Sequence, residues 1–366
     1  MVLATALAVL TLQACTAPEV RPTAAGAEVQ LHGQRGSALL PQHFVEANGV
    51  KLRFVERESG DPPVVLLHGD GSMIEDFATS GLLDLTAGPH RVLAFDRPGY
   101  CRSERPRDRE WTPEAQAEVL AAALARLGVE RPVVVGHSWG TLVALALALD
   151  HPAAVSGLVL VSGYYYPVPR PAAALAALPA VPVLGDAMRY TVAPVLSALL
   201  SPGLIAKAFD PAPVPPRFAA GFPVWLTLGP GHIRASAEDS GLLMPSAAGF
   251  EHRYGELRLP VAIVAGAEDR IVDPGLHSVR LHRELPGTTL RVVPGQGHMV
   301  HHGAAGVVAN AVEAVAAAAW QAPVSHAVRL PCPAAGRQPF SGSVPFRYAA
   351  RKPCAAVEVA HSASSR

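Results

Sequence analysis

The sequence predicts an α/β fold in which a mostly parallel central sheet is flanked by helices and carries a helical cap insertion. Short apolar runs recur along the chain at the length of buried strands, and helical segments separate several of them. Such alternation favours a parallel sheet covered by helices. Over residues 163–255 the alternation stops, and proline and alanine become frequent without any strand run.

The bulk composition restricts the class of protein. The chain has 366 residues, of which 50% are hydrophobic and 16% charged, so it can bury a large core. Lys and Arg together number 30, as do Asp and Glu, and the sequence has no basic stripe of the kind that neutralises phosphates. Nucleic acid is therefore not expected as a partner. No apolar run reaches the roughly 18 residues of a transmembrane helix.

The N-terminus resembles an export signal. Residues 2–12 form an apolar stretch, and the sequence LQAC that follows is similar to the lipobox of bacterial lipoproteins, in which the cysteine, here Cys15, is lipidated. Gln13 departs from that pattern, as does the lack of Lys or Arg before the apolar stretch. We expect an exported protein of the periplasm or cell envelope that is attached to the membrane through Cys15. If the leader is misread, the protein is cytoplasmic.

The elements of the sheet follow this leader in order. Asn48 and Gly49 join two alternating runs, as the turn of a β-hairpin does. A helix is expected after the second buried run, because Thr112 suits its N-cap, Pro113 its first position and Gly128 its end. The buried strands are predicted at residues 64–67, 92–95, 133–135, 158–161, 261–264 and 290–293.

These elements divide the chain into successive parts. Cys332 and Cys354 fall in the tail at residues 321–366, where they either pair in an oxidising compartment or stay free. The sequence makes no prediction of the oligomeric state. The predicted parts are a leader (1–15), a flexible tether (16–42), a core in two pieces (43–162 and 256–320), a helical cap (163–255) and a disordered tail (321–366).

A serine stands between two glycines at the end of one buried run. In the segment GHSWG, Ser138 follows the predicted strand at 133–135 and precedes a predicted helix at 139–150. Glycines suit a sharp strand-to-helix turn, whose crowded backbone lifts the hydroxyl clear of the sheet edge. The start of the helix also presents the N–H of Trp139 to any oxyanion that develops there. The segment therefore predicts a nucleophilic serine.

A nucleophilic serine needs a histidine as its base and a carboxylate that orients the histidine. Residues of both types follow predicted strands downstream, at the edge where open α/β sheets carry their sites. The candidates are Glu268, Asp269 and Asp273 in the segment GAEDRIVDP, and His298, His301 and His302 in the segment PGQGHMVHH.

Together these segments resemble the α/β-hydrolase fold superfamily, in its cap-bearing serine hydrolase or esterase type. HGDGS, FDRPGYCRS, GHSWG, GAEDRIVDP and GQGH match elements of that family, and the match spans about residues 44–320. Asp273 fits the family pattern less well, because the acid of the family follows its strand directly. The resemblance implies Ser138 as nucleophile, Asp269 as acid, His298 as base, and the backbone N–H groups of Asp70 and Trp139 as oxyanion hole.

The resemblance implies acyl-enzyme chemistry on a small-molecule substrate. Serine, rather than aspartate, at the strand-to-helix turn of GHSWG argues against the similar dehalogenases and epoxide hydrolases, whose nucleophile is a carboxylate. The apolar cap favours a carboxylic ester with an apolar acyl or alcohol group, with Tyr164 and Tyr165 as candidate pocket residues. The alternatives are a cap-bearing aminopeptidase or carbon–carbon bond hydrolase, and a ligand-binding protein without catalysis. The enzymatic alternatives need a charged cap residue that binds a charged end of the substrate, and the candidates are Arg234, Glu238 and Asp239.

The remaining histidines have plainer interpretations. His301 and His302 suggest a metal cluster with His298, but as neighbours at the start of a helix they are expected to point apart. No metal and no cofactor is therefore predicted. His68 and His137 are expected to be structural.

Two residues depart from the family pattern. Cys101 stands where the family often has glycine, and we expect a small packed residue there rather than a reactive thiol. The carboxylate of Asp70 would repel an oxyanion. We therefore expect its side chain to turn away and to accept backbone N–H groups of its own loop near Gly71 and Ser72.

Overall fold

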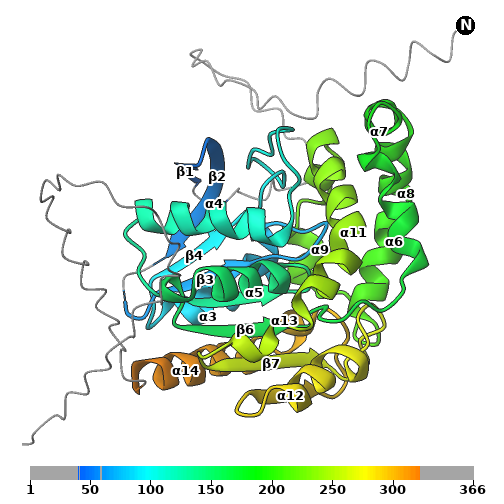
Figure 1. Ribbon diagram of the computed structural model, residues 1–366. Coiled ribbons are helices and arrows are strands. Elements are labelled where there is room, and N and C mark those ends of the chain that lie inside the picture. Colours follow the sequence, from blue (N-terminus) through cyan, green and yellow to red (C-terminus); the bar gives the residue numbers. More distant parts are fainter. Residues whose placement is uncertain (1–39, 41, 58–59, 322–366) are drawn as a thin grey trace, which may run out of the picture. The chain divides into compact units, whose positions relative to one another are not determined.

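The computed structural model describes residue 40 and residues 42–57 and 60–321 of the chain. The predicted leader with Cys15, most of the tether, and the tail with Cys332 and Cys354 lie outside these residues. Within them, eight strands form one sheet in the order β1-β2-β4-β3-β5-β6-β7-β8 (Figure 1).

The sheet is mostly parallel. Strands β1 and β2 form the predicted hairpin, with Asn48 and Gly49 at φ +48° and +73°, as its tight turn requires. β2 is also antiparallel to β4, and all other neighbouring pairs are parallel. The predicted fold class is therefore confirmed. The strands are β1 (His43–Ala47), β2 (Val50–Arg57), β3 (Val64–Leu67), β4 (Val92–Phe95), β5 (Val133–His137), β6 (Gly157–Val161), β7 (Val261–Gly266) and β8 (Thr289–Val293).

Helices cover both faces of the sheet, and each face has its own hydrophobic cluster. On β5, Val134 packs in the cluster with α4 and α5, whereas Val133 and Val135 pack in the cluster with α2, α3 and α14, because successive side chains point to opposite faces. Thr112 caps α4 as predicted, accepting the N–H of Ala115 at 3.3 Å. These helices are α2 (Ile74–Ser80), α3 (Leu82–Ala87), α4 (Pro113–Arg126), α5 (Gly140–Asp150) and α14 (Ala305–Gln321), and α12 (Arg280–Glu284) and α13 (Val300–Gly303) lie near the end of the chain.

Between β6 and β7 the chain forms six α-helices, which we call the insertion. The longest of them, α11, contacts α6, α7 and α8, and Figure 1 draws these helices in green and yellow-green. The helices of the insertion are α6 (Pro171–Ala176), α7 (Leu184–Arg189), α8 (Val192–Phe209), α9 (Pro216–Gly221), α10 (Val224–Thr227) and α11 (Pro230–Phe250).

Helix α8 exposes an apolar surface. By length and composition it could cross a membrane, with a mean hydropathy of 1.6, and only 11% of it is buried. Ser197, Ser201 and Lys207 interrupt its apolar run, which is why the sequence showed no run of that length. Leu199 is 74% and Leu204 60% exposed. The insertion therefore presents aliphatic side chains outward.

Candidate active site

Ser138 lies at the turn between β5 and α5. Its φ is +51°, in the left-handed region that few residues other than glycine adopt. A Cβ on Gly136 would lie 2.6 Å from the carbonyl oxygen of Gly140, and a Cβ on Gly140 would lie 2.3 Å from the carbonyl oxygen of Leu67. The turn therefore needs glycine at both positions, which accounts for the GHSWG segment.

Loops at the carboxyl ends of three parallel strands bring a serine, a histidine and a carboxylate together. Nε2 of His298 lies 2.9 Å from Oγ of Ser138, and Nδ1 of His298 lies 2.8 Å from Oδ2 of Asp269. His298 and Asp269 are buried. With Nδ1–H donated to the carboxylate, Nε2 can accept the Ser138 O–H. The three side chains form one hydrogen-bonded chain, which we call the Ser–His–Asp chain.

Backbone groups fix the carboxylate of Asp269. Its Oδ1 accepts the N–H groups of Ile271 and Val272, each at 2.8 Å. The other candidate acid, Asp273, accepts the N–H of Leu276 at 2.9 Å instead and so closes the next turn of its own loop. The structure thus places Asp269, and not Asp273, against the histidine.

The loop after β3 passes close to Ser138. A Cβ on Gly69 would lie 3.0 Å from Cβ of Ser138 and 3.2 Å from Nδ1 of His137, so a larger residue would crowd the serine here. Asp70 comes next in this loop, and Trp139 comes next after the serine. Within the described residues, neither backbone N–H donates a hydrogen bond to a backbone or side-chain acceptor. Two available N–H groups beside the serine are what an oxyanion hole requires.

The side chain of Asp70 does not bond its own loop, so that prediction was wrong. Its Oδ1 accepts the hydroxyl of Tyr100 at 2.9 Å, and its Oδ2 accepts the hydroxyl of Ser240 at 3.1 Å. Tyr100 comes from the loop after β4 and Ser240 from α11. Hydroxyl donors that are distant in sequence replace the local turn contacts that the sequence suggested.

Arg97 holds the backbone of the loop after β3. Its Nε donates to the carbonyl of His68 at 2.8 Å, its Nη2 to the carbonyl of Gly69 at 3.0 Å, and its Nη1 to Asp239 of α11 at 2.6 Å. The backbone N–H of Arg97 donates to Nε2 of His68 at 3.0 Å. Burial, together with the charge of Arg97, lowers the pKa of His68 well below its usual value, so this ring stays neutral.

Asp239 fastens the insertion to the core. Its Oδ2 accepts from Arg97, and its Oδ1 accepts from Arg105 at 3.0 Å. Oδ2 also lies 2.7 Å from the hydroxyl oxygen of Tyr100, whose single proton is shared between Asp239 and Asp70. Its backbone carbonyl accepts the indole N–H of Trp139 at 3.0 Å. The two guanidinium groups offset the desolvation of this fully buried carboxylate. Helix α11 is therefore attached beside both candidate oxyanion donors, and we call this set of contacts the Asp239 clamp.

The other charged residues of α11 are also paired. Glu238 accepts a hydrogen bond from Arg105 at 2.6 Å and lies 3.3 Å from Arg234. Arg234 in turn donates to the backbone carbonyl of Arg105. All three charged residues that the sequence offered for a charged substrate end, Asp239 included, are engaged with the core or with each other.

Tyr164 and Tyr165 are buried at the start of the segment that leads into the insertion. Tyr164 lines a hollow of about 270 Å³ together with Asp269 and His277. Tyr165 donates its backbone N–H to Nδ1 of His277 at 3.1 Å. Among the described residues, Ser138 does not line this hollow. The structure thus places Tyr164 on the Asp269 side of the Ser–His–Asp chain and Tyr165 in the packed interior.

His301 and His302 do not point apart as predicted. Their ring centroids lie 4.6 Å apart, and Nε2 of each approaches the buried carboxylate of Asp76, at 3.3 Å for His301 and 2.6 Å for His302. His137 packs against His301 with its Nε2 3.2 Å from the carbonyl oxygen of His298. A carboxylate on α2, far away in sequence, draws both rings to one side.

Cys101 has a φ of +48°, in the region where glycine is favoured, which explains why the family often has glycine at this position. Burial raises the pKa of its thiol, and the carboxylate of Asp96 adds to this effect. The thiolate is therefore disfavoured, which supports a packed residue over a reactive one.

A comparison with protein families agrees with this fold and geometry. The family model of the alpha/beta hydrolase fold matches residues 62–305, which include β3 to β8 and the whole Ser–His–Asp chain. The chain belongs to the alpha/beta hydrolase fold family. This hydrolase-fold protein also has similar curated relatives and solved structures.

Among the relatives, the protein named "Putative carbamate hydrolase RutD" of Shigella flexneri serotype X is 28% identical over 237 residues, which cover 65% of this chain and 84% of that protein. An alpha/beta hydrolase fold protein from Burkholderia ambifaria has a TM-score of 0.60 at 24% identity, covering 74% of this chain and 99% of its own. A thermophilic esterase from Thermogutta terrifontis has a TM-score of 0.54 at 20% identity, covering 75% and 97%. The two structural likenesses show the fold alone.

The Asp239 clamp of this hydrolase-fold chain could not be predicted from local sequence patterns. Arg97 and Asp239 are 142 positions apart, and no local pattern pairs them. Two signals were present: the arginine of FDRPGYCRS, and an acidic residue within a helix of mostly apolar and small residues. Together they call for a buried ion pair between the core and the insertion.

Proposed function

We propose that this member of the alpha/beta hydrolase fold family is a serine hydrolase of carboxylic esters with an apolar acyl or alcohol group. The observation that carries the proposal is the Ser–His–Asp chain, in which His298 lies within hydrogen-bond distance of both Ser138 and Asp269. The strained turn at Ser138 and the neighbouring backbone N–H groups supply the other parts that acyl transfer needs.

Acylation begins when Oγ of Ser138 attacks the carbonyl carbon of the ester and its proton passes to Nε2 of His298. Asp269 holds the Nδ1–H and stabilises the imidazolium that forms. The carbonyl oxygen becomes an anion that accepts the N–H groups of Asp70 and Trp139. Collapse of this intermediate breaks the ester C–O bond, the alcohol takes the proton from His298, and an acyl-enzyme remains.

Deacylation repeats these steps with water. His298 removes a proton from a water molecule, whose oxygen adds to the acyl carbon, and the same N–H groups hold the second oxyanion. Collapse breaks the bond to Ser138, which recovers its proton from His298, and the carboxylic acid leaves. The balanced reaction converts ester and water into acid and alcohol.

The insertion supports an apolar substrate. Its helix α8 is rich in aliphatic residues, and its segment 163–255 consists largely of Ala, Leu, Val and Pro. Arg234, Glu238 and Asp239 are already paired, so none of them offers an unpaired charge to the ammonium of a peptide or the carboxylate of a diketone acid. This favours an ester over the substrates of an aminopeptidase or a carbon–carbon bond hydrolase.

A hydrolysis panel tests the substrate class. Esters of graded acyl length, lactones, prolyl amides and diketones are compared by kcat/KM, with Ser138→Ala as the control. We expect the highest values for esters with apolar acyl groups and no turnover above background in Ser138→Ala. Faster cleavage of prolyl amides or diketones would replace the ester assignment with one of the alternatives. No turnover and no labelling by a fluorophosphonate would indicate a binding protein.

We also propose that the chain is exported and anchored by lipidation of Cys15. The support is the apolar stretch at 2–12 followed by LQAC. One acyl chain binds membranes only marginally, so stable attachment needs the several chains that lipoprotein processing adds. We expect a mature N-terminus at a modified Cys15, released from membranes by detergent and identified by mass spectrometry. A soluble cytoplasmic protein with an intact Met1 would contradict this proposal.

A further inference from the structure

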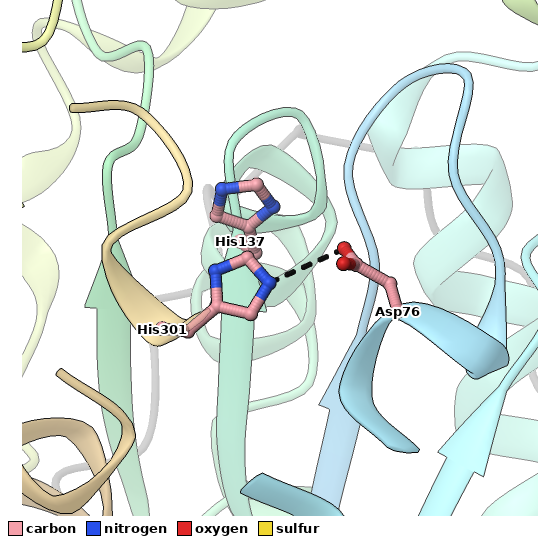
Figure 2. A group of neighbouring side chains, drawn as sticks. All are labelled: Asp76, His137 and His301. Carbon is pink, nitrogen blue, oxygen red and sulfur yellow. Dashed lines mark ion pairs between the residues drawn. The ribbon is translucent and has the colours of Figure 1, made fainter. Parts of the chain in front are cut away.

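Three buried side chains converge beside the turn that carries Ser138. Asp76, His137 and His301 each offer one ligand atom, and these three atoms lie within 4.8 Å of one another. Figure 2 shows the two rings one above the other, with the carboxylate facing both. All three residues are buried, and they come from α2, β5 and α13.

The nitrogen atoms of this group are not satisfied by hydrogen bonds. Nε2 of His137 donates to the carbonyl of His298, so its Nδ1 carries a lone pair, and this atom has no hydrogen-bond partner within the described residues. Nε2 of His301 lies 3.3 Å from Oδ2 of Asp76 without the geometry of a hydrogen bond. Buried polar atoms normally have a partner, so two such nitrogens next to a carboxylate need an explanation.

Another buried histidine in the same fold shows the contrast. His90 has Nδ1 2.8 Å from the carbonyl oxygen of Pro62 and Nε2 3.0 Å from Oε1 of Glu313, so both of its nitrogens are hydrogen-bonded. A histidine beside a carboxylate can thus be satisfied by hydrogen bonds alone in this protein. The nitrogens of His137 and His301 that face Asp76 are not.

We propose that Asp76, His137 and His301 bind a divalent transition-metal ion, with Zn²⁺ as the ion that best suits two imidazoles and a carboxylate. Zinc takes such ligands at about 2.0–2.2 Å, which sets neighbouring ligand atoms about 3.4 Å apart. The 3.3 Å between His301 and Asp76 already fits this spacing. The remaining pairs, which lie within 4.8 Å, need to close by about 1.4 Å at most when the ion binds.

Contacts around the three ligands are of the kind that metal sites use. The N–H of His137 donates to a backbone carbonyl, which fixes the tautomer that leaves Nδ1 free for a metal. The carboxylate of Asp76 is held by the hydroxyl of Ser72 at 3.0 Å and by Nε2 of His302 at 2.6 Å. These contacts fix the tautomer of His137 and the position of the Asp76 carboxylate.

The position of the site gives the ion a structural role. His137 immediately precedes Ser138, and His301 lies three positions after His298. Asp76 belongs to α2, the first helix after the loop that carries Asp70. One ion would therefore join the three segments that carry the serine, the histidine and the oxyanion loop. Because its ligands are buried, this ion holds the segments together rather than meeting the substrate.

Metal content tests the proposal directly. The full chain, without an affinity tag, is exposed to Zn²⁺, desalted and measured by mass spectrometry of its elements. We expect about one zinc per chain, and a Tm about 5 °C higher than after removal of the metal with a strong chelator. Co²⁺ in place of Zn²⁺ should give visible absorption bands of a site with nitrogen ligands. Less than about 0.1 zinc per chain together with no cobalt bands would overturn the proposal.

Variants of Asp76 and His301 test whether these residues bind the ion. Asp76→Asn and His301→Gln should each lose the bound zinc, whereas the control His90→Gln, also a buried histidine beside a carboxylate, should keep it. Zinc retained in both site variants would put the ion elsewhere and refute the assignment. If both variants fail to fold, the zinc content and cobalt spectrum of the natural chain decide the question. These measurements do not depend on esterase activity, so the failure of one proposal is distinguishable from that of the other.

Discussion

The Ser–His–Asp chain and the Asp239 clamp are two regions of one site that are built in different ways. Ser138, His298 and Asp269 each follow a strand of the core sheet, and two hydrogen bonds of 2.9 and 2.8 Å join them. The oxyanion loop depends on Arg97, whose carboxylate partner Asp239 belongs to the insertion. The core thus supplies all three side chains of the Ser–His–Asp chain, and the insertion meets this part through the backbone N–H of Met299, which donates to the carbonyl of Ala208 at 3.2 Å. The oxyanion loop instead depends on a side chain of the insertion. A substitution at Asp239 should therefore affect the oxyanion loop more than the Ser–His–Asp chain.

We expect the largest effect from substitutions in the Ser–His–Asp chain. Ser138→Ala and His298→Ala should each lower kcat by about 10³-fold or more, and the double variant should fall to the same residual level, because the residues act as one unit. Steady-state kinetics on an apolar ester measure this. Near-normal turnover in His298→Ala would show that another group is the base.

We expect a smaller effect from a substitution in the Asp239 clamp, through which the insertion supports the oxyanion loop. Asp239→Asn leaves the buried guanidinium of Arg97 without its paired carboxylate and removes one of the two carboxylates beside Arg105, so it should destabilise the fold by about 3–5 kcal/mol. It should also lower kcat/KM by about 10–100-fold, because Arg97 then holds the oxyanion loop less firmly. Urea unfolding and kinetics on the same samples measure both effects.

Glu238→Gln is the matched control for this prediction. Glu238 also pairs with Arg105, but its side chain is 26% exposed, so solvent screens the pair and the loss should stay below about 1 kcal/mol. A folded Asp239→Asn protein with full activity would contradict a role of the clamp in the oxyanion loop.

A still smaller effect is expected at the side chain of Asp70. Its carboxylate accepts the hydroxyl groups of Tyr100 and Ser240, and Asp70→Asn keeps one of the two oxygen acceptors. The loss of about one hydrogen bond should change kcat/KM by about fivefold, and Ser240→Ala should have a similar effect. A loss of 100-fold or more in a folded Asp70→Asn protein would mean that the carboxylate itself takes part in the reaction.

The Asp269 side has its own contact with the start of the insertion, and it predicts a pH dependence of stability. Nδ1 of His277 accepts the N–H groups of Tyr165 and Tyr166 at 3.1 and 3.3 Å, and burial lowers the pKa of His277 to about 4. An unfolded histidine titrates near 6.5. Between these values the unfolded chain binds a proton that the folded chain does not. The contribution of His277 is therefore complete above about pH 6.5 and is lost as the pH falls toward 4.

The expected slope from this one residue is at most about 1.4 kcal/mol per pH unit. Urea unfolding of the natural chain and of His277→Gln, each at pH 5 and pH 7.5, isolates it. The variant should lose less stability between the two values than the natural chain does. Equal losses in the two proteins would show that His277 is not held neutral by the fold.

The same contrast explains which features could be predicted from the sequence. The strands at 64–67 and 92–95 were predicted to the residue, because continuous apolar runs bury both faces of a strand. β5 continues through Gly136 and His137, since a glycine and a histidine can complete a ladder that neighbouring strands impose. The strand ends limited the acid to Glu268, Asp269 or Asp273 and the base to His298, His301 or His302, because side chains that follow parallel strands meet at one edge of the sheet. The resemblance to the α/β-hydrolase fold then selected Asp269 and His298.

Features that depend on contacts between distant segments could not be predicted. The partners of Asp70 come from the loop after β4 and from α11, and the orientation of His301 and His302 is set by Asp76 on α2. In both cases the expectation rested on sequence neighbours: Asp70 was expected to bond its own loop, and His301 and His302 to point apart. Instead, a hydrogen-bonding group that is distant in sequence determines where each side chain points. Such groups become visible only when the packing of the insertion and of α2 is known.

The acyl-enzyme is the most direct test of the proposed mechanism. An apolar p-nitrophenyl ester is mixed with the protein, the reaction is stopped with acid within the first turnovers, and the peptides are analysed by mass spectrometry. The mechanism predicts one acyl group on Ser138, formed in step with a burst of p-nitrophenol and absent in Ser138→Ala. Ester turnover with no acyl group on Ser138, or with an acyl group on another residue, would contradict it.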